Sequence, residues 1–473
     1  MRNAKSAPSA RQVVQRELIR MTTVEITPIV ESLAARCTGA VLAPGTPAYD
    51  QELLGFNLAR RHCPAAVVIA ESTADIAASV AIAAADGMRV AVKNTGHGAA
   101  DAPADSILIS TRLLDSVVLD PDARTATVGP GTVWQSVLDA AAPFGLAGLC
   151  GSAPAVGVIG YTLGGGLGPI ARAHGFAADH VVSIEFVDAT GTVRQASAID
   201  NADVFWALRG GGALAIVTSM TFELFPIQTL DGGALWFDAA DAPAVLRAWQ
   251  QWVATLPETV GTSVALLNLP PLDQLPEPLR GRSVVAVRYA DIGADGIDRL
   301  AAIRSAAPPI FDTVTEIVYP ALGAIHADPV DPMPTHERSA LLRELTADAI
   351  DALIESATDA PLAITEVRLL GGAVEREPAV PNAVSGRDAA FSLFTGGVLA
   401  PQIADIVPAA VETVLERMAP WGTGGSLLNF AGSSTGVPAD RARAAWSADD
   451  YKRLVEIRRT LDPAGVFAPS SRW

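Results

Sequence analysis

The chain has few cysteines for its length, since only Cys37, Cys63 and Cys150 occur among its 473 residues. Their spacing matches no metal-ligand pattern, and an odd number leaves at least one thiol unpaired. A disulfide framework of the kind that staples small secreted proteins is therefore not expected. We expect no metal site and a reducing compartment, the cytoplasm.

Basic residues and long apolar runs are scarce as well. Lys and Arg number 34 against 51 Asp and Glu, which gives a formal net charge of −17. The clustered cations that nucleic acid binding requires are not visible. The apolar stretch 65–85 is interrupted by two acidic residues, so it cannot supply the roughly twenty apolar residues that cross a bilayer. We expect neither a nucleic acid partner nor a membrane span.

The pattern along the chain predicts several segments. Residues 1–21 lack the apolar core of a secretory signal and are expected to form a disordered extension, with the natural start at Met1 or Met21. Residues 65–226 alternate between strand-like and helix-like patterns, and later residues alternate amphipathic strands with helices. The helical spacing over Trp446–Leu461 ends at Pro463. This length and alternation predict an α+β protein of two domains, in which the later sheet is covered by helices on one face.

Two glycine-containing stretches suggest a ligand site. The apolar strand-like run 89–93 leads into His97, which lies between two glycines, and a glycine-dense stretch covers 153–168. Glycine allows the phosphates of a dinucleotide to approach backbone N–H groups closely. A lone histidine is more often structural, and glycines can serve only tight turns, so each stretch alone is weak. Together they predict a dinucleotide cofactor.

These stretches resemble the FAD-binding domain of the vanillyl-alcohol-oxidase or PCMH type, in its berberine-bridge-enzyme-like branch. The resemblance extends from about residue 35 to the C-terminus. Further runs that carry it are 64–76, 203–212 with 216–218, and 461–467.

The resemblance implies a domain plan and a cofactor. A PCMH-type FAD-binding domain of two subdomains is expected over 22–228, a substrate-binding domain with an antiparallel sheet covered by helices over 229–429, and a returning segment over 430–473. The family commonly joins a histidine such as His97 to the flavin 8α-methyl carbon. Such a bond prevents loss of FAD and favours hydride acceptance by the flavin.

The resemblance also implies which residues bind FAD. Many relatives have a second attachment through a cysteine, but Ala153 occupies that position, so single attachment is expected; Cys150 is a less favoured alternative. The expected cofactor-binding residues are Lys93, Asn94, Thr95, Gly96, His97, Gly98, Ser152, Val156, Gly157, Val158, Gly160, Tyr161, Gly165, Gly166, Gly168, Ile216, Val217 and Asn429.

The catalytic base of the family is missing from its usual position. Many relatives place a tyrosine two residues before an asparagine, whereas this chain has Leu427 before Asn429. Candidate catalytic residues are therefore Tyr319, Asn429 and the pair Glu366 and Arg368, which share one face of a strand by its two-residue period. The pair can equally be a structural ion pair, and Asn429 can equally serve a turn. His326 and His336 lie in a loop-rich segment and could reach a cleft, but solvated loop histidines are the default interpretation.

Two other motifs favour different functions. Gly166 to Ala171 matches a Gly-x-Gly-x-x-Ala pattern for NAD, but no clear apolar strand leads into it. Gly432 to Gly436 matches the Gly-x-Ser-x-Gly pattern of hydrolases, but no histidine follows Ser434, as that arrangement requires. Both interpretations are weaker than the flavin one.

The expected function is an FAD-dependent oxidase. It would take a hydride from a C–OH or C–N carbon of a small organic substrate, such as a sugar, an alcohol or a secondary metabolite, and reduce dioxygen. The alternatives are a flavin dehydrogenase with another acceptor and a flavin-binding protein without turnover. The sequence does not distinguish the substrate or the oligomeric state.

Overall fold

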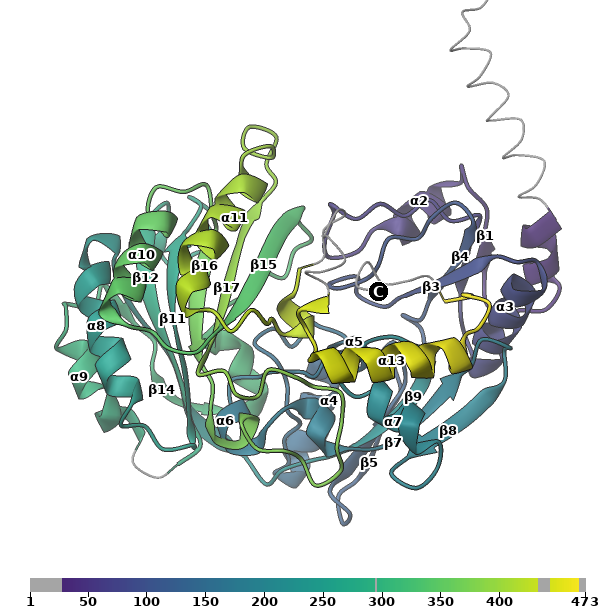
Figure 1. The fold of residues 1–473 in the computed structure, drawn as a ribbon, viewed down its shortest axis with the longest axis horizontal. Coiled ribbons are helices and arrows are strands. Elements are labelled where there is room, and N and C mark those ends of the chain that lie inside the picture. Colours follow the sequence, from purple (N-terminus) through teal and green to yellow (C-terminus); the bar gives the residue numbers. More distant parts are fainter. Residues whose placement is uncertain (1–27, 294–295, 433–442, 468–473) are drawn as a thin grey trace, which may run out of the picture.

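The computed structural model describes residues 28–293, 296–432 and 443–467. The predicted extension 1–21, both candidate starts and Ser434 lie outside these ranges. Figure 1 shows two parts side by side, an N-terminal part with two smaller sheets and a middle part built on one large sheet. Within the described ranges, every helix is too short or too polar to cross a membrane.

The first sheet of the N-terminal part has four strands. Their order is β1 (Val41–Leu42), β2 (Ala66–Ile69), β4 (Ser106–Ser110) and β3 (Arg89–Lys93). Strands β2, β4 and β3 are parallel, so the chain must cross over between them. Helix α3 (Thr73–Ala85) makes one crossover, and α2 (Pro47–Leu53) precedes β2.

The second sheet has five antiparallel strands and lies on the other side of α3, which contacts both sheets. Short helices are inserted before its third strand in sequence and after its fourth. The strand order is β5 (Val117–Asp120), β6 (Thr125–Val128), β9 (Ile216–Glu223), β7 (Val181–Val187) and β8 (Val193–Ser197), and the helices are α4 (Trp134–Ala141), α5 (Val158–Leu163), α6 (Ala171–His174) and α7 (Ala202–Ala207).

The middle part is one eight-stranded antiparallel sheet. Helices α8 (Ala242–Val253), α9 (Ala301–Arg304), α10 (Ala347–Ala357) and α11 (Val407–Met418) pack on one face of it (Figure 1). The strand order is β13 (Phe311–Asp312), β10 (Thr229–Asp238), β12 (Ser283–Asp291), β11 (Val260–Asn268), β16 (Ile364–Leu369), β17 (Phe391–Val398) and β15 (Thr335–Leu342), and β14 (Thr315–Val318) also pairs with β10.

Strand periodicity assigns the two faces of this sheet. Val285, Val287 and Tyr289 of β12 pack under the helices. Because successive side chains alternate across a strand, Arg288 lies on the opposite face. That face is directed toward the N-terminal part and carries the polar residues described below.

The C-terminal segment returns to the N-terminal part, where α13 (Ala448–Leu461) lies along it (Figure 1). The Trp446 indole donates to the carbonyl of Gly210 at 3.1 Å, and the Val90 N–H donates to the carbonyl of Val466 at 2.6 Å. The helix predicted over 446–461 is confirmed, with its first turn beginning at Ala448. The predicted fold class, α+β with a helix-covered antiparallel sheet, is also confirmed.

Asp75 joins three segments at the edge of the first sheet. Its buried carboxylate accepts hydrogen bonds from Thr38 N at 2.7 Å, Gly39 N at 3.2 Å and Glu71 N at 2.9 Å. Burial opposes ionisation, but these hydrogen bonds outweigh it and lower the pKa of Asp75 below its ordinary value of 3.8. The carboxylate therefore stabilises the fold in its ionised form.

We predict that Asp75→Asn lowers the free energy of unfolding by about 1–3 kcal/mol at pH 7, because an amide cannot accept all these hydrogen bonds. A depressed pKa gives stability that is present above the unfolded pKa and lost as pH falls through the folded one. The difference from the wild type should thus shrink below the ordinary pKa of 3.8. Urea unfolding across pH 3–7 measures it, with exposed Asp122→Asn as control; equal stabilities at pH 7 contradict the prediction.

Candidate functional site

The loop after β3 is anchored from below by a buried lysine. Lys93 ends the strand, and its Nζ donates to the carbonyls of Glu52 at 2.5 Å and Leu54 at 2.6 Å. Gly96 has φ +80° and lies so close to Gly55 that an added Cβ would be 2.6 Å from the Gly55 Cα. The backbone of the loop is therefore tightly constrained, and the Lys93 ammonium group is already hydrogen-bonded to two carbonyl groups.

His97 is fixed in position on this loop. Its ring stacks on Phe56 with centroids 4.0 Å apart and planes 14° apart, and its Nδ1 lies 2.8 Å from Thr95 Oγ1. Burial lowers the pKa of His97 to about 4, against a smaller opposing effect of Asp328. The imidazole is therefore neutral near pH 7, and when Nδ1 donates to Thr95 the Nε2 atom carries the lone pair.

The loop and the glycine-dense stretch meet at Asn94. An added Cβ on Gly157 would lie 2.8 Å from the Asn94 side-chain nitrogen. That nitrogen is buried and has no hydrogen-bond partner among the described residues. Gly98 and Gly160 are exposed, and an added Cβ at either would meet nothing within 4 Å. The two stretches thus form adjoining walls with open backbone and an unused polar group.

The turn that follows α5 is packed by backbone. An added Cβ on Gly168 would lie 2.1 Å from the Cys150 carbonyl oxygen. The Tyr161 hydroxyl lies close by, buried and without a hydrogen-bond partner among the described residues. Cys150 is fully buried, and burial raises the pKa of its thiol well above the ordinary value, so it is a poor nucleophile.

Asn429 holds this turn. Its side-chain oxygen accepts from Gly166 N at 2.9 Å, and its side-chain nitrogen donates to the Tyr161 carbonyl at 3.0 Å. The turn role considered for Asn429 is therefore observed, with both ends of its amide engaged by the glycine wall. Leu427, at the position of the family tyrosine, is buried against Phe176 in a small apolar cluster.

The other expected cofactor residues fall into two groups. Ser152 and Val156 are half-buried ahead of α5, Val158 is its first residue, and Gly165 accepts from Ala178 N at 2.9 Å within the turn. Ile216 and Val217 lie in β9 with buried side chains that belong to the core. Their side chains are therefore committed to packing rather than to the walls.

Glu366 and Arg368 lie on the sheet face directed toward the N-terminal part. They form an ion pair with Arg368 Nη2 3.2 Å from Glu366 Oε2, while Arg288 Nη1 is 2.7 Å from Oε1. Two guanidinium groups hold the pKa of Glu366 well below its ordinary value despite complete burial. A carboxylate so strongly stabilised as an anion is a weak proton acceptor.

The remaining predicted base, Tyr319, belongs to the core. Its hydroxyl donates to the Gly148 carbonyl at 2.8 Å, and burial raises its pKa well above the ordinary value. His326 was expected in solvent but is only 6% exposed. It follows the 3₁₀ segment Tyr319–Ile325, which packs under β10 and β12, so its ring reaches the ion pair instead.

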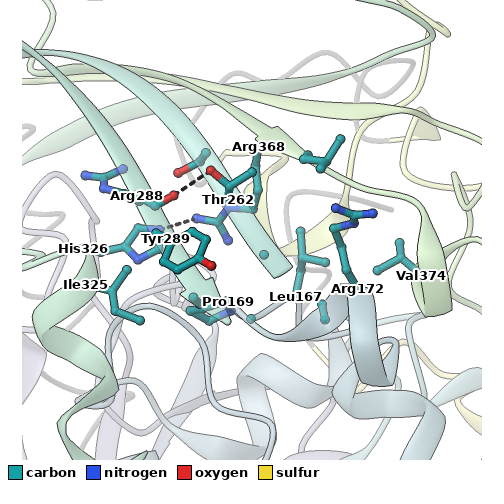
Figure 2. Close-up of a pocket in the computed structure, with 16 residues that line it drawn as sticks. Leu167, Pro169, Arg172, Thr262, Arg288, Tyr289, Ile325, His326, Arg368 and Val374 are labelled. Carbon is teal, nitrogen blue, oxygen red and sulfur yellow. Dashed lines mark hydrogen bonds between the residues drawn. The ribbon is translucent and has the colours of Figure 1, made fainter. Parts of the chain in front are cut away.

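Several residues of this cluster were missed in the sequence. Ser263 pairs across the sheet with both Arg288 and Arg368, and Arg172 of α6 lines the same hollow (Figure 2). A usable signal was Arg288 itself, the single charge within the otherwise apolar run Val284–Ala290. Which strands would adjoin it was not readable from local sequence.

We predict that the glycines of the wall differ in what they tolerate. Gly168→Ala should lower the melting temperature and the soluble yield strongly, because its Cβ meets the Cys150 carbonyl. Gly160→Ala should keep or slightly raise the melting temperature of the flavin-free protein, because alanine is favoured over glycine inside a helix by about 1 kcal/mol. Thermal melts of both variants test this, and equal losses would show that the turn is not packed as described.

Comparison with known proteins identifies this architecture. A family described as "FAD binding domain" matches residues 64–197. The (R)-6-hydroxynicotine oxidase of Paenarthrobacter nicotinovorans is 23% identical over 459 residues, which cover 91% of this chain and 95% of that protein. The FAD-linked oxidoreductase easE of Arthroderma benhamiae is 32% identical over 241 residues, which cover 47% of this chain and 45% of that protein.

Solved structures share the whole fold. The Physcomitrella patens BBE-like 1 protein superposes with a TM-score of 0.80 at 21% identity, covering 93% of this chain and 98% of that one. The xylooligosaccharide oxidase of Myceliophthora thermophila, solved with xylobiose, gives 0.79 at 22% identity, covering 94% and 98%. With a match to the FAD binding domain family in its N-terminal part and the fold of these structures throughout, the chain is similar to FAD-linked oxidoreductases and shares the fold of the berberine-bridge-enzyme-like proteins.

Proposed function

We propose that this FAD-linked oxidoreductase is an oxidase that takes a hydride from a C–OH or C–N carbon of a small organic substrate, with dioxygen as the acceptor. The observation that carries the proposal is the meeting of the His97 loop with the glycine wall at Asn94 and Gly157, opposite a polar sheet face. Relatives named as oxidases of 6-hydroxynicotine and of xylooligosaccharides support the reaction class.

The described residues fit the cofactor. The buried, unpartnered nitrogen of Asn94 and hydroxyl of Tyr161 are polar groups that a bound ligand can satisfy. Open backbone at Gly98 and Gly160 admits close approach of a dinucleotide. We propose that the loop 93–98 and the wall 152–168 hold FAD, with Nε2 of His97 as its single covalent attachment.

When bound, FAD supplies the two-electron acceptor for the hydride. The chain contributes orientation and electrostatics. Glu366, Tyr319 and Asn429 are each engaged in ways that leave none as a free base. We therefore propose that Arg288 and Arg368 act through their positive field, which lowers the pKa of a substrate hydroxyl so that its proton passes to solvent water while the hydride passes to the flavin.

The second candidate is a flavin-binding protein without turnover, and the buried Leu427 in place of the family tyrosine favours it. A dehydrogenase that uses another acceptor is a variant of the first proposal. Stopped-flow reoxidation of the reduced flavin by dioxygen distinguishes oxidase from dehydrogenase, and reduction by any organic substrate excludes the protein without turnover.

We also propose that the protein resides in the cytoplasm. Cys37, Cys63 and Cys150 are all free thiols in the structure. Free thiols persist most readily in a reducing compartment. Fractionation of the native host, with probing of Cys63 by a membrane-impermeant thiol reagent, would test it.

We predict that the purified protein keeps flavin after acid precipitation and that peptide mass analysis finds it on His97. His97→Ala should release all flavin under acid while retaining the fold, because the stacked ring is half-buried at a loop rather than in the core. Thr95→Val should slow attachment, since Nδ1 would lose the hydroxyl 2.8 Å away. Free FAD in the wild-type supernatant would remove the covalent bond but not the flavin assignment.

A second prediction concerns Gly160. If the open backbone there is the approach path for the cofactor, Gly160→Ala should reduce the flavin-to-protein absorbance ratio of a fully folded protein. Gly422→Ala is the control, since this glycine has φ −73°, its added Cβ would have its nearest neighbour at 3.3 Å, and it lies outside both walls. Normal flavin content in the Gly160 variant would confine the glycine to a structural role.

A further inference from the structure

A hollow lies between the glycine wall, residues 152–168, and the sheet of the middle part, and basic side chains line it in a chain whose net charge is −17. Arg172 enters it from α6, Arg288 from β12 and Arg368 from β16, with His326 beside them. Figure 2 shows Arg368 and His326 joined by a hydrogen bond, with Arg172 across the hollow near Leu167 and Val374. We call this set of four residues the arginine hollow.

The hydrogen-bond acceptors of its surroundings are already occupied. Glu366 Oε1 accepts from Ser263 Oγ at 2.5 Å and from Arg288 Nη1 at 2.7 Å, and Oε2 accepts from Arg368 Nη2 at 3.2 Å. Thr262 Oγ1 accepts from the Trp249 indole at 3.1 Å and itself donates to the Arg288 carbonyl. The only carboxylate in contact with Arg288 and Arg368 among the described residues thus already accepts three hydrogen bonds of the about four that a carboxylate can accept, and His326 Nε2 lies 3.5 Å from its Oε1.

Several hydrogen-bond donors of the arginine hollow, by contrast, have no partner in the described part of the chain. Arg172 Nε, Arg288 Nε, Arg368 Nη1 and His326 Nδ1 are buried and have no partner among the described residues. These residues are 9%, 3%, 9% and 6% exposed, so solvent does not replace the missing partners. Leaving such a group unsatisfied is unfavourable, and more so when it is charged.

The state of His326 strengthens this asymmetry. Burial, together with Arg288, lowers its pKa, so the ring is neutral at pH 7. Its Nε2 lies 3.3 Å from Arg368 Nη2 and 3.5 Å from Glu366 Oε1. A guanidinium can only donate, so when Nε2 accepts from Arg368 the ring proton is on Nδ1, and the unpartnered Nδ1 is then a donor like the others.

The net charge of the hollow also favours an anionic ligand. Arg288 and Arg368 face one carboxylate, Glu366, and Arg172 adds a third guanidinium whose charge is offset in part by the exposed Glu258, so with His326 neutral the hollow is net positive. The chain as a whole carries −17. A buried cationic site with spare donors and no spare acceptor is matched by an anion rich in acceptors.

We propose that the substrate of this enzyme carries a carboxylate, which the arginine hollow binds through Arg368 Nη1, Arg172 Nε and the His326 N–H. The proposal rests on the proposed function, because the hollow adjoins the wall that would hold FAD. A planar carboxylate suits the forked donors of arginine. The carboxylate is a binding handle and is not itself changed, so the substrate class is hydroxy acids, amino acids or sugar acids.

The test is a titration of the flavin-loaded wild-type protein with benzoate and with benzamide, read by the change in flavin absorbance. Benzoate should perturb the spectrum and compete with substrate acids such as mandelate or glucuronate, whereas neutral benzamide should bind far more weakly. Arg368→Lys keeps the charge beside Glu366 but loses the fork, and Arg172→Gln removes one donor. Each should weaken benzoate binding about 10-fold to 100-fold, as expected for a hydrogen bond to a charged group.

The matched control is Arg282→Gln, which removes an exposed ion pair with Asp238 outside the hollow and should leave benzoate binding unchanged. Equal binding of benzoate and benzamide, or no carboxylate-dependent spectral change, overturns the proposal. So does a shift of the flavin reduction potential in Arg368→Lys with unaltered benzoate affinity, because the donors would then serve the flavin itself. Absence of flavin from the wild type would instead overturn the proposed function, so the two failures are distinguishable.

Discussion

Backbone contact between the two parts of the chain is the constraint on which the site depends. The turn after α5 is pressed from one side by the Cys150 carbonyl, which comes within 2.1 Å of where a Gly168 Cβ would be. On the other side its own Pro169 carbonyl lies within 1.8 Å of the position of a Gly261 Cβ in β11. Only glycine permits both approaches. The turn is therefore held between the two parts by backbone contacts. These contacts fix the distance between the glycine wall and the polar face of the sheet.

These backbone contacts explain why the polar residues of the sheet can be so deeply buried. Ions removed from water are tolerated when they are paired and hydrogen-bonded. Glu366 satisfies this rule through Arg288, Arg368 and Ser263. The arginines satisfy it only in part, since each retains a buried donor without a partner among the described residues. Natural sites leave such groups unsatisfied where a ligand completes them.

The loop and the wall that we propose for the cofactor could be recognised in the sequence because their signals are local. His97 and its glycines lie within one loop, the wall lies within one short stretch, and α13 follows its own periodicity. The substrate side was less accessible, because Ser263, Arg288 and Arg368 adjoin only through the register of β12, β11 and β16. The two-residue period of a strand placed Glu366 and Arg368 on one face, but it did not reveal that Arg288 also pairs with Glu366. The burial of His326 was not predicted, because the exposure of a loop depends on which distant segments pack against it.

The contrast between the surface and the arginine hollow has a kinetic consequence. An anion approaching the protein meets a net charge of −17, and this repulsion acts over the Debye length of about 8 Å at physiological ionic strength. The attraction of the hollow acts only at contact and is shielded from salt by burial. Added salt therefore relieves the barrier to encounter more than it weakens the bound state, so association with an acidic ligand would quicken with ionic strength, the reverse of ordinary electrostatic steering.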